Sequence, residues 1–158
     1  EKEVLGAFHS EHFPVKWADG AADFAFDDKW EKRQVYVVEG ISKLPQYAFS
    51  KRVLYIDKDA YAVPFSDMYD HSGELWKIWV NNFSHGKEAF PGSKMKYDEE
   101  TPFPSAAVMV DIQLEHATKA ALPSHRFPGE PGWYWHQGEK EGTTEDKFTI
   151  AELIGSGH

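Results

Sequence analysis

Cysteine is absent from this 158-residue chain, which excludes disulfide bonds, thiolate nucleophiles and metal sites built on cysteine. No apolar run approaches the roughly 20 residues that a membrane-spanning helix needs. Basic residues are in the minority: 17 lysines and arginines stand against 26 aspartates and glutamates, a formal net charge of −9. This charge argues against nucleic acid as a partner and disfavours attraction to an anionic lipid surface, and its simplest role is solubility.

Aromatic residues, by contrast, are abundant and make up 15% of the chain, within a hydrophobic fraction of 41%. Large flat side chains pack well across β-strands and on surfaces that meet apolar ligands. The 27% of charged residues is typical of a globular protein, and the length suffices for one domain with its own core. We therefore expect a single β-rich domain over residues 1–158. The chain begins EKEVLGAFHSEH, without a start methionine or an export signal, so we expect a processed or truncated product.

Residues 34–82 show the clearest organisation, an antiparallel meander of short strands separated by polar turns. Residues 1–33 have no clean period and are predicted to be irregular, with a short strand or helical turn at most. Aspartate and glycine favour turns at 57–59 and 70–73. The strands of the meander are predicted at residues 35–39, 51–57, 61–68 and 74–82.

Beyond the meander, residues 83–104 are predicted to form a long loop, and residues 105–158 further strands and a short C-terminal helix. Residues 106–114 alternate between apolar and polar positions, which is typical of a strand with one apolar face. Thr149 and Glu152 have the spacing of a helix capping box. The predicted fold class is mainly β (β-rich α+β): a curved antiparallel sheet or incomplete barrel of about six to eight strands, with one or two short helices.

Residues that would carry catalysis or hold a metal are scattered. His9 and His12 lack the H-E-x-x-H order of a zinc helix, and the carboxylates at 98–100 are typical of a solvated loop. No G-x-S-x-G elbow or phosphate-binding loop occurs. We therefore predict a protein that is not an enzyme and has no cofactor and no metal. Four aspartates that resemble calcium ligands at first sight lack EF-hand spacing and are explained by turns: Asp57, Asp59, Asp67 and Asp70.

Apolar side chains on several of the predicted strands form a continuous wall. In the strand at 74–82, alternation puts Trp76, Ile78 and Val80 on one face. The wall is either an ordinary sheet core packed on helices or, because the chain is poor in helix, the lining of a lipid-sized cavity. The candidate lining residues are Val53, Tyr55, Trp76, Ile78, Val80, Val108, Val110, Ile112 and Leu114.

Three motifs between Trp30 and Val80 carry a family resemblance: R-x-V-x-V-V-E, S-K-R-x-x-Y-I-D and D-x-Y-D-x-x-G-x-L-W-K. Together they resemble a proteobacterial envelope family of unknown function that is usually described as outer-membrane lipoprotein-sorting-like. That family is similar to the lipoprotein carrier and receptor proteins of the periplasm, in which an incomplete antiparallel barrel holds acyl chains in an apolar cavity. The family's usual chain is longer, so the resemblance implies that this chain is the C-terminal part of a longer precursor.

The resemblance brings no catalytic residues with it and implies a periplasmic or outer-membrane-associated protein. The expected function is non-enzymatic binding of lipid or lipoprotein acyl chains in an apolar cavity of the curved sheet. The expected partners are that acyl chain and either the missing N-terminal part or another envelope protein. The alternative is a structural or interaction subunit of an envelope export assembly, with a filled core.

Overall fold

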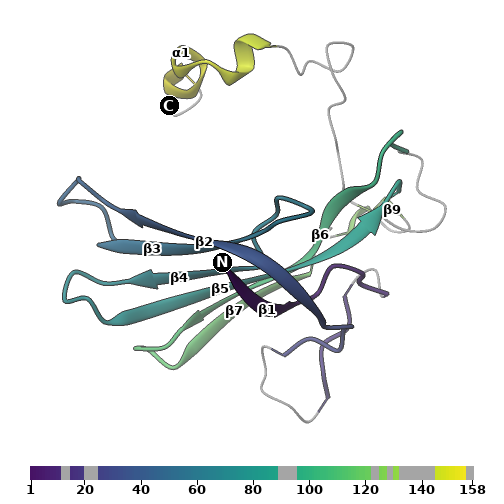
Figure 1. Ribbon diagram of the computed structural model, residues 1–158, viewed down its shortest axis with the longest axis horizontal. Coiled ribbons are helices and arrows are strands. Elements are labelled where there is room, and N and C mark those ends of the chain that lie inside the picture. Colours follow the sequence, from purple (N-terminus) through teal and green to yellow (C-terminus); the bar gives the residue numbers. More distant parts are fainter. Residues whose placement is uncertain are drawn as a thin grey trace.

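The computed structural model describes residues 1–11, 15–19, 25–88, 96–121, 125–127, 130–131 and 145–155. Within these residues, seven antiparallel strands form one open, twisted sheet in which every strand pairs with its neighbours in the sequence (Figure 1). The prediction of a mainly β fold with an unclosed antiparallel sheet is therefore confirmed. The strands of the sheet are β1 (Lys2–Gly6), β2 (Glu31–Ile41), β3 (Lys51–Asp57), β4 (Phe65–Tyr69), β5 (Leu75–Gly86), β6 (Thr101–Asp111) and β7 (His116–Ala121).

Shorter elements follow the sheet. Strands β8 (His125–Phe127) and β9 (Glu130–Pro131) form a separate two-stranded pair. Near the end, the 3-10 helix η2 (Glu145–Phe148) precedes helix α1 (Ile150–Gly155). The predicted capping box is partly present, because the Glu152 backbone N–H donates to Thr149 Oγ1 (3.2 Å). Part of the segment predicted to hold further strands, residues 132–144, lies outside the described residues.

Several boundaries differ from the predicted ones. β3 has the predicted bounds, but β4 begins at Phe65 instead of residue 61, because Pro64 has no N–H to donate to a neighbouring strand. The long loop predicted at 83–104 is wrong: β5 continues to Gly86 and β6 begins at Thr101. A register shift beside Phe83 allows this extension, since it accommodates Pro104 in the pairing. In the segment predicted to be irregular, residues 2–6 form the edge strand β1.

The strand register defines two faces of the sheet, because residues directly opposite on antiparallel strands point the same way. We call one side the core face; two rows of residues cross it. The first row is Val37, Tyr55, Phe65, Val80 and Val108, and the second is Val53, Asp67, Ile78, Val110 and Ala117. We call the other side the open face; its central row is Val38, Leu54, Ser66, Trp79, Met109 and Thr118.

Residues 15–19 and 25–30, which we call the strap, cover part of the core face. Trp17 and Phe26 form an isolated β-bridge, and their rings stack with centroids 4.8 Å apart. Val15 and Phe26 are buried against Ala106 and Val108, and this cluster is the hydrophobic core of the sheet. Trp17 and Phe26, which belong to the N-terminal segment without a regular sequence pattern, therefore cover β5 to β7.

A partly buried polar network fixes the strap to the end of the sheet. Asp28 Oδ2 accepts hydrogen bonds from Ser10 Oγ (2.6 Å) and from Asn82 Nδ2 (2.8 Å). The hydroxyl groups of Ser10 and Ser105 lie 2.7 Å apart, and Asn82 and Ser105 are fully buried. Because buried polar groups need partners, this network holds the strap in one position.

Candidate functional site

Six of the nine candidate lining residues lie together on the core face, but the strap covers half of them. Cross-strand pairing aligns Val53, Tyr55, Ile78, Val80, Val108 and Val110 on this face. Val80 and Val110 pack against the strap's core cluster, and Val108 belongs to it. This half of the predicted wall is thus an ordinary packed core. The other three residues, Val53, Tyr55 and Ile78, are not part of this cluster.

A β-bulge turns Trp76 to the face opposite the predicted one. The β4–β5 register shifts beside Met68 and leaves Trp76 as an extra residue. Trp76 Nε1 donates to Asp111 Oδ2 (3.1 Å), and Lys77 Nζ lies 4.4 Å from the Trp76 ring centroid. Lys77 and Asp111 are cross-strand partners on the open face. The prediction that Trp76 shares a face with Ile78 is therefore wrong, because the bulge breaks the period of two.

Ile112 and Leu114 do not lie on a strand. β6 ends at Asp111, whose Oδ1 accepts the Leu114 backbone N–H (3.0 Å) and turns the chain. Glu115 completes the turn with φ 50°. In this turn, Ile112 is 42% and Leu114 is 74% exposed. The predicted continuation of the strand to residue 114 is wrong, because the apolar alternation continues into the turn.

The open face carries apolar residues that the wall hypothesis did not include. Val38 is 44% exposed and Trp79 is 37% exposed. Leu54, which lies between them in the row, and Met109, which lies beside Trp79, are half-buried. Tyr36 extends this surface along β2 and is also exposed. The signal for it was present in β3, where apolar residues occupy both faces.

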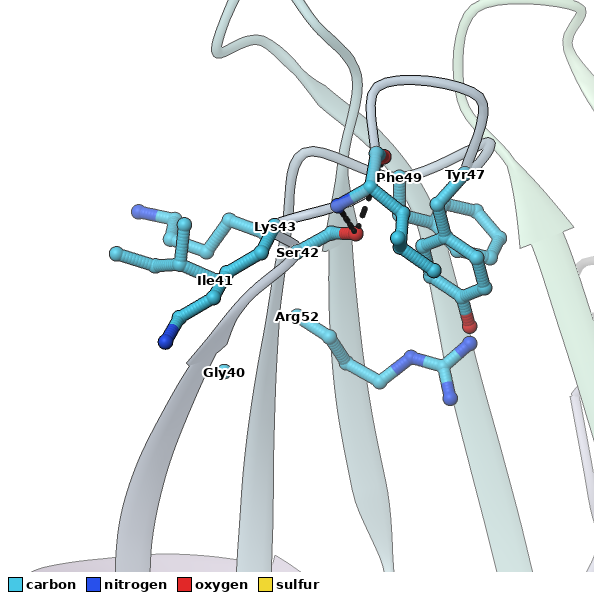
Figure 2. Close-up of a pocket in the computed structure, with 9 residues that line it drawn as sticks. Gly40, Ile41, Ser42, Lys43, Tyr47, Phe49 and Arg52 are labelled. Carbon is cyan, nitrogen blue, oxygen red and sulfur yellow. Dashed lines mark hydrogen bonds between the residues drawn. The ribbon is translucent and has the colours of Figure 1, made fainter.

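A shallow depression of about 340 Å³ lies at the β2–β3 turn, and Figure 2 shows its lining side chains. It contains none of the nine candidate lining residues. Three cations and several exposed apolar side chains surround it, and Arg52 extends toward the side on which Tyr47 and Phe49 lie (Figure 2). Its lining residues are Gly40, Ile41, Ser42, Lys43, Leu44, Tyr47, Phe49, Lys51 and Arg52.

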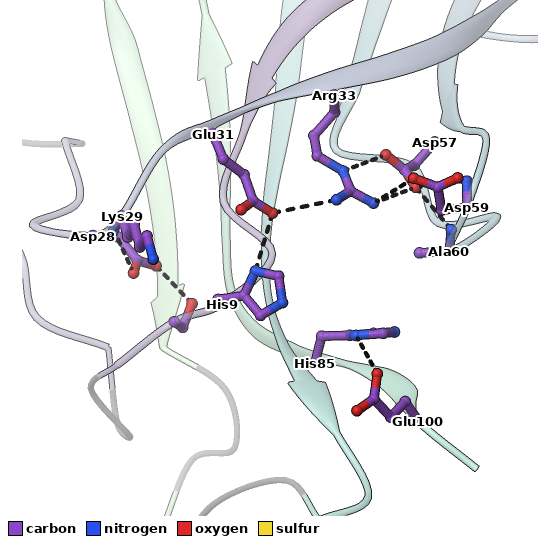
Figure 3. A network of polar contacts seen from close by, with 11 residues as sticks. His9, Asp28, Lys29, Glu31, Arg33, Asp57, Asp59, Ala60, His85 and Glu100 are labelled. Atoms are coloured by element: carbon purple, nitrogen blue, oxygen red, sulfur yellow. Dashed lines mark hydrogen bonds and ion pairs between the residues drawn. The ribbon is translucent and has the colours of Figure 1, made fainter.

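A polar network at the opposite end of β2 is centred on Arg33 (Figure 3). Arg33 binds Asp57 with two hydrogen bonds, Nε to Oδ2 (2.7 Å) and Nη2 to Oδ1 (2.9 Å). Asp57 Oδ1 also accepts the backbone N–H groups of Asp59 and Ala60, so the predicted turn is confirmed. Burial raises the pKa of Asp57, but the hydrogen bonds from Arg33 and these amides outweigh it and hold the pKa below its usual value.

Two histidines extend this network toward β5. His9 Nδ1 lies 3.0 Å from Glu31 Oε1, His85 Nδ1 lies 3.7 Å from Glu100 Oε2, and the two imidazole rings meet edge to face at 5.9 Å (Figure 3). Within the described residues, no three histidine or carboxylate side chains are arranged to hold a metal ion. His12, the second histidine of the sequence candidate, lies outside the described residues. In this arrangement each imidazole lies beside a carboxylate.

The acidic turn between β4 and β5 has a structural role. Asp70 Oδ1 accepts hydrogen bonds from the Ser72 hydroxyl (2.7 Å) and from the Ser72 and Glu74 backbone N–H groups. Gln113 donates to Asp70 Oδ2 (2.8 Å) and joins the β4–β5 and β6–β7 turns. The hydrogen bonds from Ser72 and Gln113 lower the pKa of Asp70 to about 2. Gly73 has φ 86°, so the predicted glycine turn at 70–73 is confirmed.

No helix among the described residues combines the length and the hydrophobicity needed to cross a bilayer. No curated protein matches the chain. Among solved structures, a crystallised domain from Vibrio parahaemolyticus, provisionally described as an outer membrane lipoprotein-sorting protein domain, is similar to it with a TM-score of 0.47 and 16% identity. The alignment covers 96% of this chain and 47% of that domain, so this chain spans about half of the domain's length.

A family model matches residues 8–153, which include the strap, β2 to β9 and most of α1. The match also contains all three motifs of the segment from Trp30 to Val80, and it confirms their resemblance to a family of unknown function. The chain therefore belongs to the family described as "Protein of unknown function (DUF1329)".

Proposed function

We propose that this chain is a bacterial envelope protein that binds an acyl chain of a lipid or lipoprotein on its sheet and catalyses no reaction. The observation that carries the proposal is the open face. In its central row, Val38 and Trp79 are exposed and Leu54 and Met109 are half-buried. Among the described residues, the strands of this sheet pair only with one another. The motif resemblance supports the envelope location and the acyl-chain ligand.

The open face is favoured over the core face as the binding surface. On the core face, Val108 is 1% exposed beneath the strap, so an acyl chain would have to displace the strap there. On the open face, an acyl chain would lie along Val38, Leu54, Trp79 and Met109, which already contact water. Each methylene removed from water contributes about 0.8 kcal/mol, so a long chain needs only partial burial to bind.

Val37 and Val38 provide a matched test, because they are adjacent in β2, 43% and 44% exposed, and point to opposite faces. We expect Val38→Asp to abolish binding of a fluorescent fatty-acid probe and Val37→Asp to leave it within about twofold, because a charge beside an acyl chain must be desolvated. The protein is first purified without detergent and examined by native mass spectrometry for bound lipid. Absence of both bound lipid and probe affinity would contradict the proposal. Loss of binding only in Val37→Asp would move the site to the core face.

The packed cluster under the strap favours a second candidate. A filled core and an exposed apolar face also fit an interaction subunit of an envelope assembly, in which another chain, such as a second copy, covers the open face. Light scattering separates the two candidates: a chain that self-associates through the open face, loses this in Val38→Asp and binds no fatty-acid probe would favour the interaction subunit.

A further inference from the structure

The tip of the β2–β3 hairpin, residues 40–52, has a charge opposite to that of the whole chain. We propose that this hairpin tip docks on the surface of an anionic phospholipid bilayer. The inference goes beyond acyl-chain binding and rests on different residues. The tip carries Lys43, Lys51 and Arg52 and contains no aspartate or glutamate, although acidic residues outnumber basic ones in the chain by 26 to 17.

Large apolar side chains project from the same tip. Ile41 is 69%, Leu44 58% and Tyr47 46% exposed, and these residues line the depression with the three cations (Figure 2). Exposed apolar residues beside cations are the combination that binds the bilayer interface, because the apolar groups enter the headgroup region and the cations meet lipid phosphates.

Two of the three cations have no carboxylate partner among the described residues. Lys43 is exposed and has no ion-pair partner among the described residues, whereas Lys51 Nζ lies 3.4 Å from Glu39. Arg52 has no carboxylate partner in the described chain. Its guanidinium lies over the Phe49 ring at 5.1 Å, Nη2 contacts Met68 Sδ at 3.5 Å, and Nε is buried with no hydrogen-bond acceptor among the described residues.

The backbone of the tip is held in place, so the residues are presented together. Ser42 Oγ accepts the Leu44 backbone N–H (3.2 Å), and the Tyr47 backbone N–H donates to the Leu44 carbonyl (3.0 Å). His71 Nε2 lies 2.8 Å from the Tyr47 carbonyl and connects the tip to the β4–β5 turn. Little ordering is therefore needed on binding.

The negative charge of the rest of the chain weakens this attraction but does not cancel it. The neighbouring turns carry Asp70, Glu74 and Glu115, and Asp70 is engaged by Ser72 and Gln113. At physiological ionic strength, charges more than about 8 Å from the bilayer are largely screened. The β4–β5 turn, which carries Asp70 and Glu74, lies beside the tip, because His71 contacts the Tyr47 carbonyl. Docking therefore requires the exposed side chains of Lys43, Ile41 and Leu44 to meet the bilayer ahead of these carboxylates.

Vesicle sedimentation of the full chain tests the proposal, with neutral phosphatidylcholine vesicles and vesicles that also contain phosphatidylglycerol. We expect binding to the anionic vesicles only. Lys43→Gln should weaken it about fivefold, the equivalent of about 1 kcal/mol per cation at the surface. Lys29→Gln is the matched control, because Lys29 is exposed beside the start of β2, at the other end of that strand. Leu44→Ser should weaken binding, and Leu114→Ser, in the β6–β7 turn, should not.

Equal binding to neutral and anionic vesicles, no binding to either, or equal losses in Lys43→Gln and Lys29→Gln would overturn the proposal. Displacement from vesicles by inorganic phosphate at constant ionic strength would also overturn it, in favour of a site for free anions. Fatty-acid probe binding is measured on the same variants. A chain that binds no probe but binds anionic vesicles through Lys43 would refute the proposed function and leave this inference intact.

Discussion

Replacing Arg33 by glutamine is expected to destabilise the protein strongly, because the change leaves the Asp57 carboxylate buried without its cation. Asp57 is 0% exposed and the Arg33 side chain 16% exposed, and the two are joined by the bidentate pair of hydrogen bonds. Breaking a buried pair from one side costs about 3–5 kcal/mol. For a chain of this size, that corresponds to a fall in Tm of about 6–20 °C.

The pH dependence of the loss identifies its cause. In the wild type, Asp57 has a lowered pKa, so its stabilising contribution is present above the ordinary carboxyl pKa of about 4 and is lost as the pH falls through the lower folded value. In Arg33→Gln, burial remains while the strongest opposing interaction is gone, so the buried carboxylate is better tolerated when protonated. The difference in unfolding free energy between the two proteins should therefore be largest near pH 7 and shrink toward pH 4.

Urea unfolding at pH 4 and pH 7 measures this difference. The control is Lys58→Gln, which removes the exposed ion pair with Glu1 (2.9 Å) and should change stability far less. A loss in Arg33→Gln below about 1 kcal/mol, or one that is equal at the two pH values, would refute the argument that an unpaired buried charge causes it.

Two further predictions concern single aromatic residues. Burial and the hydrogen bond to Asp67 (2.8 Å) raise the pKa of Tyr55 to about 12, so absorbance titration should show a late-ionising tyrosine that Tyr55→Phe removes. Because the folded state holds this proton longer, stability should fall as the pH rises from about 10 toward 12, and an unchanged titration curve in the variant would contradict the assignment. Phe8→Ala should cost about 3–5 kcal/mol in urea unfolding, since Phe8 is 1% exposed and stacks on Phe83, whereas Leu5→Ala, at a side chain 57% exposed, should cost less than about 0.5 kcal/mol. Similar costs for the two would show that the Phe8 site is not closely packed.

Local patterns predicted the β-rich class and the meander, because each depends on neighbouring residues. β3 occupies the predicted residues, and the turns at Asp57 and Gly73 form as their side-chain chemistry and conformational freedom require. Alternation within single strands also predicted that Val53 shares a face with Tyr55, Ile78 with Val80, and Val108 with Val110. These features were predictable because hydrogen bonds and side-chain direction within one or two strands determine them.

The remaining parts of the candidate site depend on a β-bulge, a turn and a long-range contact, and strand alternation predicts none of these. One extra residue at Trp76 reverses its face, and a turn that contains Ile112 and Leu114 imitates the alternation of a strand. The strap covers the core face because Phe26 and Val108 pack in one cluster. These two residues are 82 positions apart in the sequence. Which apolar face remained uncovered was therefore not predictable from strand patterns.

The unbroken order of the sheet, from β1 to β7, has a consequence for folding. Each pairing from β2 to β7 joins strands that are consecutive in the chain, so the loss of chain entropy on pairing is divided among local steps and the sheet can grow strand by strand. Docking of the strap on β6 joins segments that are distant in the chain, so we expect it to be the slower, non-local step. Opening of that segment alone would expose Val108 while every hairpin stays paired, so hydrogen exchange should detect it as a separate unit of lower stability.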